Sequence, residues 1–266
     1  MRIRKKPWAA KELAENLNII HNPEPYKVLQ YFDANQNTQL DISQDTQYNI
    51  FQDTQHDISQ DTQHSISQDT QHDISQDTQH GIHLELGCGK GRFIVQTATQ
   101  NPTINHIAIE REPIVLAVAA RKAREVGDHL TNLKFLNLDA SELAEYFNPG
   151  EIHRLYINFC DPWHRRKKWA KRRLTHSNFL SLYEKLKIPE IFFKTDNRIL
   201  FEFSINQFSE QNWVMKNISL DLHKSDIKDN VMTEYEEKFS ASGPIYRLEA
   251  CNKSSYGRRT QCECIK

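Results

Sequence analysis

The segment LELGCGKG, at residues 84–91, is the feature that most restricts the possible folds of this chain. It joins the apolar run IHLELG (82–87) to RFIVQTATQ, in which apolar residues recur at helical spacing. Glycines at such a junction allow a tight turn and let the backbone approach a ligand closely. The spacing is E-x-G-x-G-x-G rather than the dinucleotide fingerprint G-x-G-x-x-G, because Arg92 occupies the position of the third glycine. The segment therefore predicts a strand–loop–helix unit that binds a ligand at its loop.

Strand-like apolar runs and amphipathic helical segments alternate along the following part of the chain. Further strands are predicted at 104–110, 132–139, 152–159, 190–196, 213–222 and 244–250. Helices are predicted between them, most clearly from Pro113 to Gly127. This alternation predicts a three-layer, Rossmann-like α/β domain over residues 82–250, with a mostly parallel sheet of seven strands. A C-terminal tail is predicted at 251–266.

A near-exact octapeptide repeat of the type DISQDTQH fills residues 41–80 in five copies. Each copy has so little apolar surface that burial cannot offset the entropy lost on ordering. We therefore predict a low-complexity, disordered insertion over residues 33–81, which follows a basic N-terminal arm at 1–32. A short β-prone or helical assembly tract is the alternative. The histidines of the repeat are expected to have been copied with it rather than to bind metal.

The net charge of −1 conceals parts of opposite sign. The repeat contains aspartate but no Glu, Lys or Arg, so the remainder of the chain is basic. Its cations cluster in HRRKKWAKRR, at residues 164–173, and in RIRKK, at residues 2–6. Such clusters predict a polyanionic partner such as a nucleic acid, although any single cation could equally belong to a solvated face.

Cysteine usage and hydropathy indicate the cellular compartment that we expect for the protein. The five cysteines contain no CxxC pair, and Cys262-x-Cys264 is too closely spaced for a usual structural zinc site. An odd number of cysteines without a secretory signal predicts reduced thiols in a cytoplasmic protein. No apolar run reaches the roughly 18 residues that indicate a membrane span. We therefore expect no metal and no membrane association, and both a monomer and a homodimer remain open.

Three acidic residues, Glu85, Glu110 and Asp139, lie at the carboxyl ends of the first three predicted strands. Ligands of open α/β sheets bind at this edge. Glu110 is placed to accept hydrogen bonds from two ribose hydroxyls, and Asp139 from an adenine amino group. Glu110 alone would fit a structural role equally well. Together with the E-x-G-x-G-x-G loop, however, the set predicts binding of S-adenosylmethionine (SAM), which has no pyrophosphate to be held by a bare helix N-terminus.

The fourth predicted strand ends in NFCDPW (158–163), which brings Asp161 to the same edge of the sheet. Amino-group methyltransferases hold a flipped base with a related [DN]-P-P-aromatic tetrapeptide, whereas this chain has only Pro162 before Trp163. Asp161 is therefore predicted to point at the pocket in which a methyl group is transferred. Trp163 and Trp169 could stack on an unpaired base, although Trp169 could equally anchor its loop.

The chain resembles the bacterial tRNA (guanine-N7)-methyltransferases, which modify the variable-loop guanine. The resemblance rests on MRIRKKPW, LELGCGKGRFI, IAIE, LNLDA, YINFCDPW…KRRLTH, FKTDN…LFEFS and MTEYEEKFSASGPIYR. It covers the chain outside roughly residues 33–81 and the closing CNKSSYGRRTQCECIK. Two features depart from the family pattern. His164 replaces the second proline of D-P-W-P, and the octapeptide insertion is not part of the family core.

The resemblance implies a class I SAM-dependent methyltransferase fold, with SAM as the cofactor and tRNA as the partner. It assigns cofactor binding to Glu85, Gly87, Glu110, Asp139 and Asp161, and the catalytic role to Asp161. It implies substrate contacts at Arg165 or Arg166, and at Asp196, Thr233, Glu234, Tyr235 and Glu236. The basic run supplies the predicted RNA contacts, namely Lys167, Lys168, Lys171, Arg172 and Arg173.

The chemistry of guanine N7 fits this inventory. N7 carries an in-plane lone pair and no proton, so its methylation needs positioning rather than a general base. Nearby carboxylates would stabilise the positive charge that develops on the purine. Asp161, Asp196, Glu234 and Glu236 could also accept hydrogen bonds from guanine N1–H and the N2 amino group, which adenine does not offer in the same pattern. Two alternatives remain: a methyltransferase of the same fold that modifies an exocyclic amino group, and an RNA-binding protein with an inactive SAM pocket.

Overall fold

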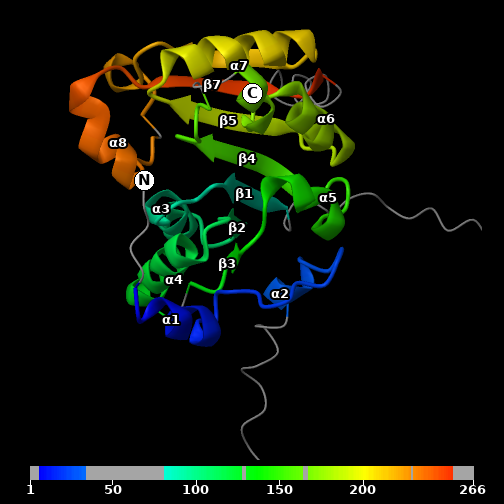
Figure 1. Cartoon of the computed structure of the whole chain (residues 1–266), viewed down its shortest axis with the longest axis vertical. Helices are drawn as coiled ribbons and strands as arrows, with labels where there is room; N and C mark the ends of the chain where they lie inside the picture. Colours follow the sequence, from blue (N-terminus) through cyan, green and yellow to red (C-terminus); the bar gives the residue numbers. More distant parts are fainter. Residues whose placement is uncertain (1–5, 34–80, 128–129, 164–166, 229, 254–266) are drawn as a thin grey trace, which may run out of the picture.

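The computed structural model describes residues 6–33, 81–127, 130–163, 167–228 and 230–253. Within these residues, seven strands form a single sheet with helices on both faces (Figure 1). The strands are β1 (Ile82–Leu86), β2 (Asn105–Ile109), β3 (Leu133–Leu136), β4 (Ile152–Asn158), β5 (Glu190–Thr195), β6 (Val214–Ser219) and β7 (Tyr246–Cys251). The octapeptide repeat, with its predicted disorder, lies outside the described residues.

The strand order is β3-β2-β1-β4-β5-β7-β6, and the sheet is mostly parallel. Strands β1 to β5 pair in parallel, whereas β7 is antiparallel to both β5 and β6. The fold class and the seven predicted strands are confirmed, although β3 and β6 are shorter than predicted. The chain leaves β1 on one side toward β2 and later returns on the other side as β4, which creates a crevice at the carboxyl ends of these strands.

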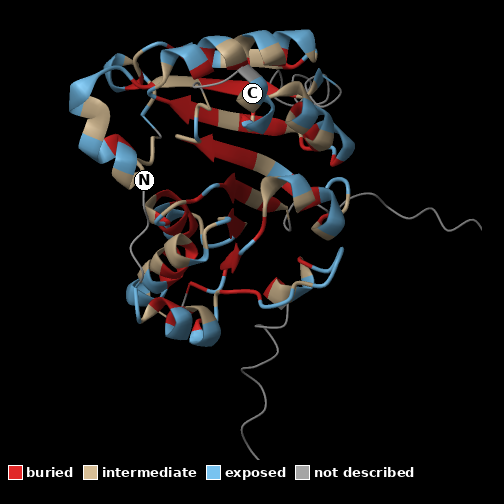
Figure 2. Ribbon diagram, viewed as in Figure 1, coloured by how far each residue is buried: buried red, intermediate tan, exposed pale blue. Residues whose placement is uncertain are grey.

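Helices cover the two faces because each presents an apolar stripe to the sheet. On one face lie α3 (Arg92–Gln100) and α4 (Pro113–Val126), and on the other lie α5 (Leu143–Tyr146), α6 (Ser177–Lys185) and α7 (Arg198–Glu210) (Figure 1). Figure 2 shows that the buried residues concentrate in the strands and on the sheet-facing sides of these helices. The sheet therefore forms a rigid platform whose carboxyl edge can position side chains.

The segment before the repeat contributes to the same core. Helix α1 (Ala9–Glu15) packs against α4, and Ile19 forms a β-bridge with Phe135 of β3. Helix α2 (Gln30–Asp33) follows. Three apolar residues of this segment join the main hydrophobic cluster: Ile20, Val28 and Phe32. The segment predicted as a basic arm therefore lies largely against the sheet, while Arg2, Arg4 and Lys5 fall outside the described residues.

The remaining elements are short. They are α8 (Glu234–Phe239) and the 3₁₀ helices η2 (Ala140–Glu142), η3 (Lys167–Arg172), η4 (Leu222–Lys224) and η5 (Ser240–Ser242). The described helices include none with the length and apolarity that crossing a membrane requires. Likewise, the described His, Cys, Asp and Glu side chains do not form a group of three or more suited to holding a metal ion.

Candidate active site

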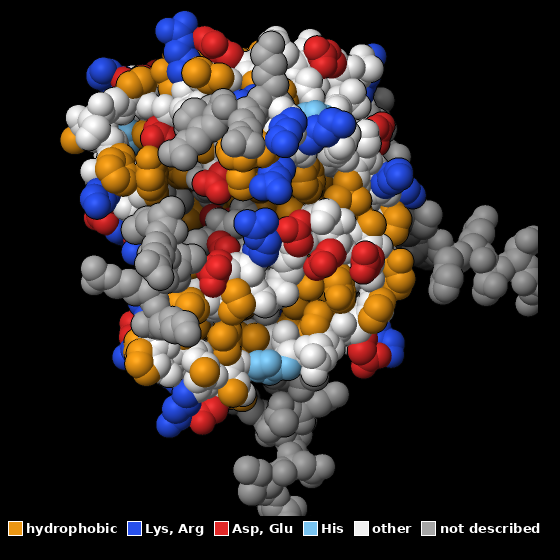
Figure 3. Space-filling view, in the orientation of Figure 1, with side chains coloured by type: hydrophobic (Ala, Val, Ile, Leu, Met, Phe, Trp, Pro, Cys, Tyr) orange, Lys and Arg blue, Asp and Glu red, His pale blue; other side chains and the backbone are white. Residues whose placement is uncertain are grey.

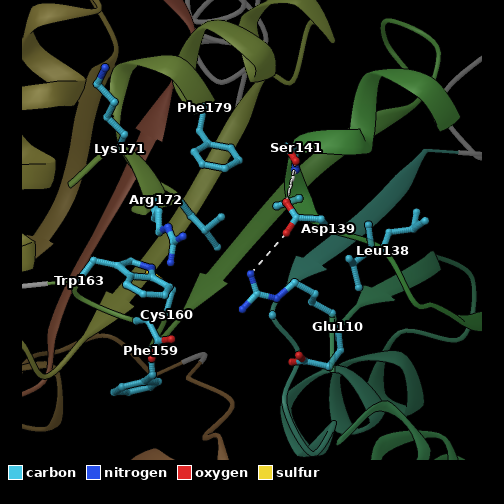
Figure 4. A pocket seen from close by; sticks show the side chains of 16 residues that line it. Glu110, Leu138, Asp139, Ser141, Phe159, Cys160, Trp163, Lys171, Arg172 and Phe179 are labelled. Atoms are coloured by element: carbon cyan, nitrogen blue, oxygen red, sulfur yellow. Dashed lines mark hydrogen bonds and ion pairs between the residues drawn. The ribbon is translucent and has the colours of Figure 1, made fainter. Parts of the chain in front are cut away.

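A pocket of about 550 Å³ lies at the carboxyl ends of the central strands (Figure 4). Its lining includes Gly87 after β1, Glu110 after β2, Asp139 after β3 and Asp161 after β4. The structure thus brings together four of the five residues that the sequence assigned to the cofactor. The fifth, Glu85, is buried in β1, two residues before Gly87.

The glycine loop leaves room in front of its backbone. Gly87, Gly89 and Gly91 have φ angles of 71°, 57° and 78°, in the left-handed region that favours glycine. A Cβ atom at Gly87 or Gly89 would meet nothing within 4 Å, whereas one at Gly91 would lie 2.6 Å from Cβ of Ala119 in α4. The loop therefore packs tightly onto α4 at its third glycine and offers open backbone at its first two.

Glu110 is fixed at the edge of the pocket by backbone donors. The N–H of Gly89 donates to its Oε2 at 3.1 Å, and the N–H of Glu112 donates to its Oε1 at 3.0 Å. Each oxygen retains a further acceptor site for a ligand. A carboxylate held in this way, next to open glycine backbone, suits the two hydroxyls of a ribose.

Asp139 caps η2 and remains ionised. Its Oδ1 accepts hydrogen bonds from the side chain of Ser141 at 2.7 Å and from the backbone N–H of Ser141 at 3.0 Å. These bonds, together with the charge of Arg111 at 3.5 Å, hold the pKa of Asp139 below its usual value. Figure 4 shows this carboxylate on the same side of the pocket as Glu110. An ionised acceptor here fits the amino group of an adenine.

Glu85 is the buried acid of the site. Glu85 is only 1% exposed, and the Nδ2 of Asn158 donates a hydrogen bond to its Oε1 at 2.8 Å. Within the part of the chain that the structure describes, its Oε2 is a buried oxygen without a hydrogen-bond partner. Such an oxygen calls for a hydrogen-bond partner from a ligand. With the open glycine backbone, it shows that these residues fit a ligand such as SAM, which carries amino and hydroxyl groups.

Raising the pH is expected to destabilise the protein through Glu85. Burial raises its pKa from 4.5 to about 8, so the folded state keeps a proton that the unfolded state releases. The free energy of unfolding therefore falls as the pH rises through this window. Urea unfolding between about pH 5 and pH 8 should show a larger loss for the unmodified chain than for Glu85→Gln, by about 1 kcal/mol or more. Equal losses in the two proteins would show that Glu85 does not titrate there.

Asp161 stands between two aromatic residues with unusual backbone conformations. Phe159 and Trp163 have φ angles of 51° and 45°, a region that costs energy for bulky residues and often marks functional sites. Both residues line the pocket together with Asp161 (Figure 4). The turn after β4 therefore brings the exposed residue Asp161 to the pocket together with these two aromatic residues. This placement agrees with the prediction from DPW, while the catalytic role of Asp161 stays a prediction.

Cys160 also lines this turn but is not a nucleophile at neutral pH. Burial, reinforced by the negative charge of Asp161, raises the pKa of its thiol to about 12. The thiolate is the reactive form of cysteine. The thiol instead packs against the main hydrophobic cluster.

The basic loop divides into pocket-facing and buried cations. Lys171 and Arg172 line the pocket, and the guanidinium of Arg172 lies 4.8 Å from the ring of Trp163. Lys168 is exposed in η3. The ring of Trp169 packs edge-on against Trp163 at 6.0 Å, which favours its role as a loop anchor. Lys168, Lys171 and Arg172 are therefore accessible for phosphate contacts.

Arg173 does not fit its predicted role as an RNA contact. It is 8% exposed, its Nε donates to the carbonyl oxygen of Pro162 at 2.8 Å, and its guanidinium lies 4.3 Å from the ring of Phe203. It fastens the DPW turn to α7 because both its charge and its apolar stem are used internally. Arg165 and Arg166, and the side chain of Lys167, lie outside the described residues.

The predicted substrate residues 233–236 begin α8, and they point in different directions. Thr233 caps the helix, since its Oγ1 accepts from the N–H of Glu236 at 2.9 Å. Glu234 forms an ion pair with Lys122 of α4. Tyr235 is 42% exposed, and its hydroxyl donates to Oδ2 of Asp196 at 2.9 Å. Burial and this bond raise the pKa of Tyr235 to about 12, so the phenol stays protonated.

The prediction that Glu236 contacts the substrate does not agree with the structure. The Glu236 side chain is 0% exposed and forms an ion pair with Lys194 at 2.8 Å. Three residues that matter for the site were not singled out from the sequence: Asn158, Lys194 and Arg111. Asn158 bonds to Glu85, Lys194 anchors α8, and Arg111 lines the pocket beside Asp139. A polar residue on a buried strand, as at 158 and 194, was the available signal.

The lining of the pocket is of mixed sign, with Glu110, Asp139 and Asp161 alongside Arg111, Lys171 and Arg172. Figure 3 shows acidic and basic side chains close together over the middle of the face, with hydrophobic side chains between them. A surface that binds RNA only through its phosphates is expected to be predominantly basic. The mixture fits an enzyme that binds a polyanion while keeping carboxylates at its reaction centre.

The fold and this pocket define a Rossmann-like, SAM-dependent methyltransferase, since acids follow β2, β3 and β4 and a further acid lies in β1, around an open glycine loop. A family model described as "Putative methyltransferase" matches residues 79–248.

Known relatives specify the family. The chain is 43% identical over 253 residues to the tRNA (guanine-N(7)-)-methyltransferase of Bacillus subtilis, which covers 94% of this chain and 98% of the relative. The enzymes of the same name from Listeria monocytogenes and Clostridioides difficile are 54% and 51% identical over 172 residues, each covering 64% of this chain and 79% of the relative. The chain belongs to the tRNA (guanine-N(7)-)-methyltransferase family.

Proposed function

We propose that this protein transfers the methyl group of SAM to N7 of a guanine in tRNA, at the variable-loop position implied by the resemblance. The observation that carries the proposal is the placement of Asp161. It lines the same pocket as Phe159, Trp163, Gly87 and Glu110. A base and a methyl donor can therefore meet in one space. The names of the relatives support guanine N7 as the acceptor.

The donor side of the pocket is built from four residues. Glu110 and Asp139 are oriented carboxylates, Gly87 leaves open backbone, and Glu85 keeps a buried carboxyl oxygen without a partner among the described residues. When bound, SAM supplies an electrophilic methyl group on its sulfonium. The four residues orient that ligand and exclude water from its buried end, so that binding fixes the direction of the reacting bond.

The acceptor side requires no general base, because guanine N7 carries no proton. The ring of Trp163, with Arg172 against it, offers a face on which a purine can stack. The Asp161 carboxylate then lies where positive charge develops on the purine during transfer. Asp196 and Glu234 are the two acids of this region that are available as acceptors for the guanine edge. Glu236 is buried and does not reach the guanine.

Phosphate contacts come from the exposed cations of the loop, Lys168, Lys171 and Arg172. Each phosphate that they neutralise releases counterions, so binding of tRNA weakens as salt increases. We propose that the enzyme acts in the cytoplasm, where tRNA is available and cysteines stay reduced.

The site of methylation is tested directly by chemical cleavage of the product. Treated tRNA is reduced with borohydride and cleaved with aniline, which breaks the chain at N7-methylguanine. Cleavage at one variable-loop guanine is the expected result, with no cleavage when SAM is omitted. Methyl incorporation without cleavage would point to an exocyclic amino group. Binding of tRNA without any methyl incorporation would point to an RNA-binding protein with an inactive pocket.

A further inference from the structure

Helix α8 is anchored on its inner side by a buried charge. Glu236, on the inner side of the helix, is 0% exposed. Its Oε2 accepts from Nζ of Lys194 at 2.8 Å, and its Oε1 accepts from Nδ2 of Asn230 at 2.7 Å and lies 3.2 Å from Nε2 of His223. Every oxygen of this carboxylate is therefore engaged inside the protein. The carboxylate is therefore not placed to contact a base.

Lys194 of β5 is the cation that pairs with Glu236. Its side chain is 7% exposed, and its ammonium donates to Oδ1 of Asn230 at 2.9 Å, to the carbonyl oxygen of Val231 at 2.9 Å and to Glu236. An ammonium has three N–H donors, so these acceptors satisfy it completely. Removing a charge from water is costly unless partners compensate it. Moving these acceptors away would leave the ammonium buried without partners, so it holds the segment that leads into α8 in place.

Lys194 near the end of β5 and Asp196 just after it contact α8 at two points. Two residues after Lys194, the carboxylate of Asp196 accepts from the hydroxyl of Tyr235. The ring of Tyr235 lies 5.2 Å from that of Phe159 in the pocket, and the Lys194 ammonium lies 6.0 Å from the same Phe159 ring. The position of Tyr235 relative to the pocket is therefore set through Glu236 and Lys194.

Lys194 also adjoins the donor side of the site. It pairs in register with Asn158 of β4, whose amide donates to Glu85. A single buried residue thus lies next to the wall of the donor pocket and beneath the helix on the acceptor side. We infer that Lys194 is a positioning residue for methyl transfer, which fixes α8 and its Tyr235–Asp196 contact beside the pocket residue Phe159, and that Glu236 is its counter-ion rather than a substrate contact. The inference rests on the proposed function.

The test replaces both charges at once, with Lys194→Met combined with Glu236→Met. An apolar pair of similar size often folds as well as the buried ion pair it replaces, so the sheet is expected to stay intact. Without the ion pair, hydrogen exchange of the amides in residues 230–243 should accelerate at least about tenfold, because local opening becomes easier. Exchange in β1 to β5 should not change. This measurement uses neither tRNA nor SAM.

Steady-state methylation completes the test. The double variant should lose at least about tenfold in kcat/KM for tRNA, since a small misplacement of positioning groups is costly. Its Kd for SAM should stay within about threefold, which is less than 1 kcal/mol. The matched control is Arg154→Met with Glu190→Met, a second charge pair at 2.6 Å on the same face of the sheet but not bonded to α8. This control should leave both exchange in 230–243 and tRNA kinetics unchanged.

The outcomes separate the inference from the function on which it rests. Faster exchange in 230–243 with unchanged tRNA kinetics would overturn the positioning role and leave the proposed function standing. Unchanged exchange would overturn the anchoring itself. An unmodified protein that fails to methylate tRNA would overturn the proposed function, whatever the exchange result. If the double variant does not fold, Glu236→Gln carries the same measurements. Global unfolding of both variants would make the pair a determinant of the whole fold and overturn its local role.

Discussion

Asp161→Ala is expected to lower kcat for tRNA methylation by at least about a hundredfold, the usual loss when one preorganised electrostatic group is removed from a reaction centre. Asp161 is exposed in the turn after β4 and lines the pocket together with Phe159 and Trp163. The buried acid and the two oriented carboxylates of the donor side remain in place in this variant. The Kd for SAM should therefore rise by no more than about threefold. Single-turnover methylation and titration of SAM measure the two effects separately.

Asp161→Asn is the matched control, because it preserves the shape and hydrogen-bonding reach of the side chain and removes only its charge. If charge stabilisation dominates, Asn should be nearly as inactive as Ala. If acceptance of a guanine N–H dominates, Asn should recover part of the activity, since its amide oxygen still accepts. A parallel loss of SAM affinity and turnover would show that Asp161 serves the cofactor alone.

Gly91→Ala is expected to lower the free energy of unfolding by about 3 kcal/mol, through left-handed backbone strain and overpacking together. The new Cβ would lie 2.6 Å from Cβ and 2.9 Å from Cα of Ala119, so the backbone of α4 has to move. The φ angle of 78° adds a penalty that no repacking removes. Urea unfolding monitored by circular dichroism measures the loss.

Gly89→Ala is the control for the backbone term. Its φ angle of 57° is also positive, but its Cβ would meet nothing within 4 Å, so only about 1 kcal/mol should be lost. The contact term is isolated by introducing Gly91→Ala into an Ala119→Gly background. There the cost should fall by about 1 kcal/mol or more, since contacting residues couple in a double-mutant cycle. Equal costs in the two backgrounds would exclude the contact with Ala119 as a cause.

The sheet and the donor side of the site were predictable from the sequence because they depend on local patterns. Apolar runs, a glycine loop and strand-end acids specify β1 to β4 and bring Gly87, Glu110 and Asp139 to one edge. Parallel strands place their carboxyl ends side by side whatever the details of packing. That regularity made the pocket accessible to sequence reasoning, even though the individual roles of its residues remain to be measured.

Two predicted contact residues, one for the substrate and one for RNA, have the expected charge but side chains that point into the protein. Glu236 and Arg173 both belong to charged stretches, and both turn inward to partners far away in the chain, Lys194 and Phe203. A helix of six residues presents its side chains in every direction, so the string TEYE cannot tell which acid faces out. The packing of the N-terminal segment on α4 and β3 was missed for the same reason, since its partners lie more than a hundred residues away.

The place where the repeat joins the fold has an evolutionary consequence. Gly81 leads directly into the amino-terminal end of β1, whereas the pocket lies at the carboxyl ends of the strands (Figure 1). Tandem DNA repeats change copy number readily by slippage during replication. Gain or loss of a unit therefore changes the chain next to a junction that lies at the opposite end of β1 from the pocket. Selection on methyl transfer therefore exerts little pressure on the length of the insertion, and related genes are expected to differ in copy number while retaining the motifs of the pocket.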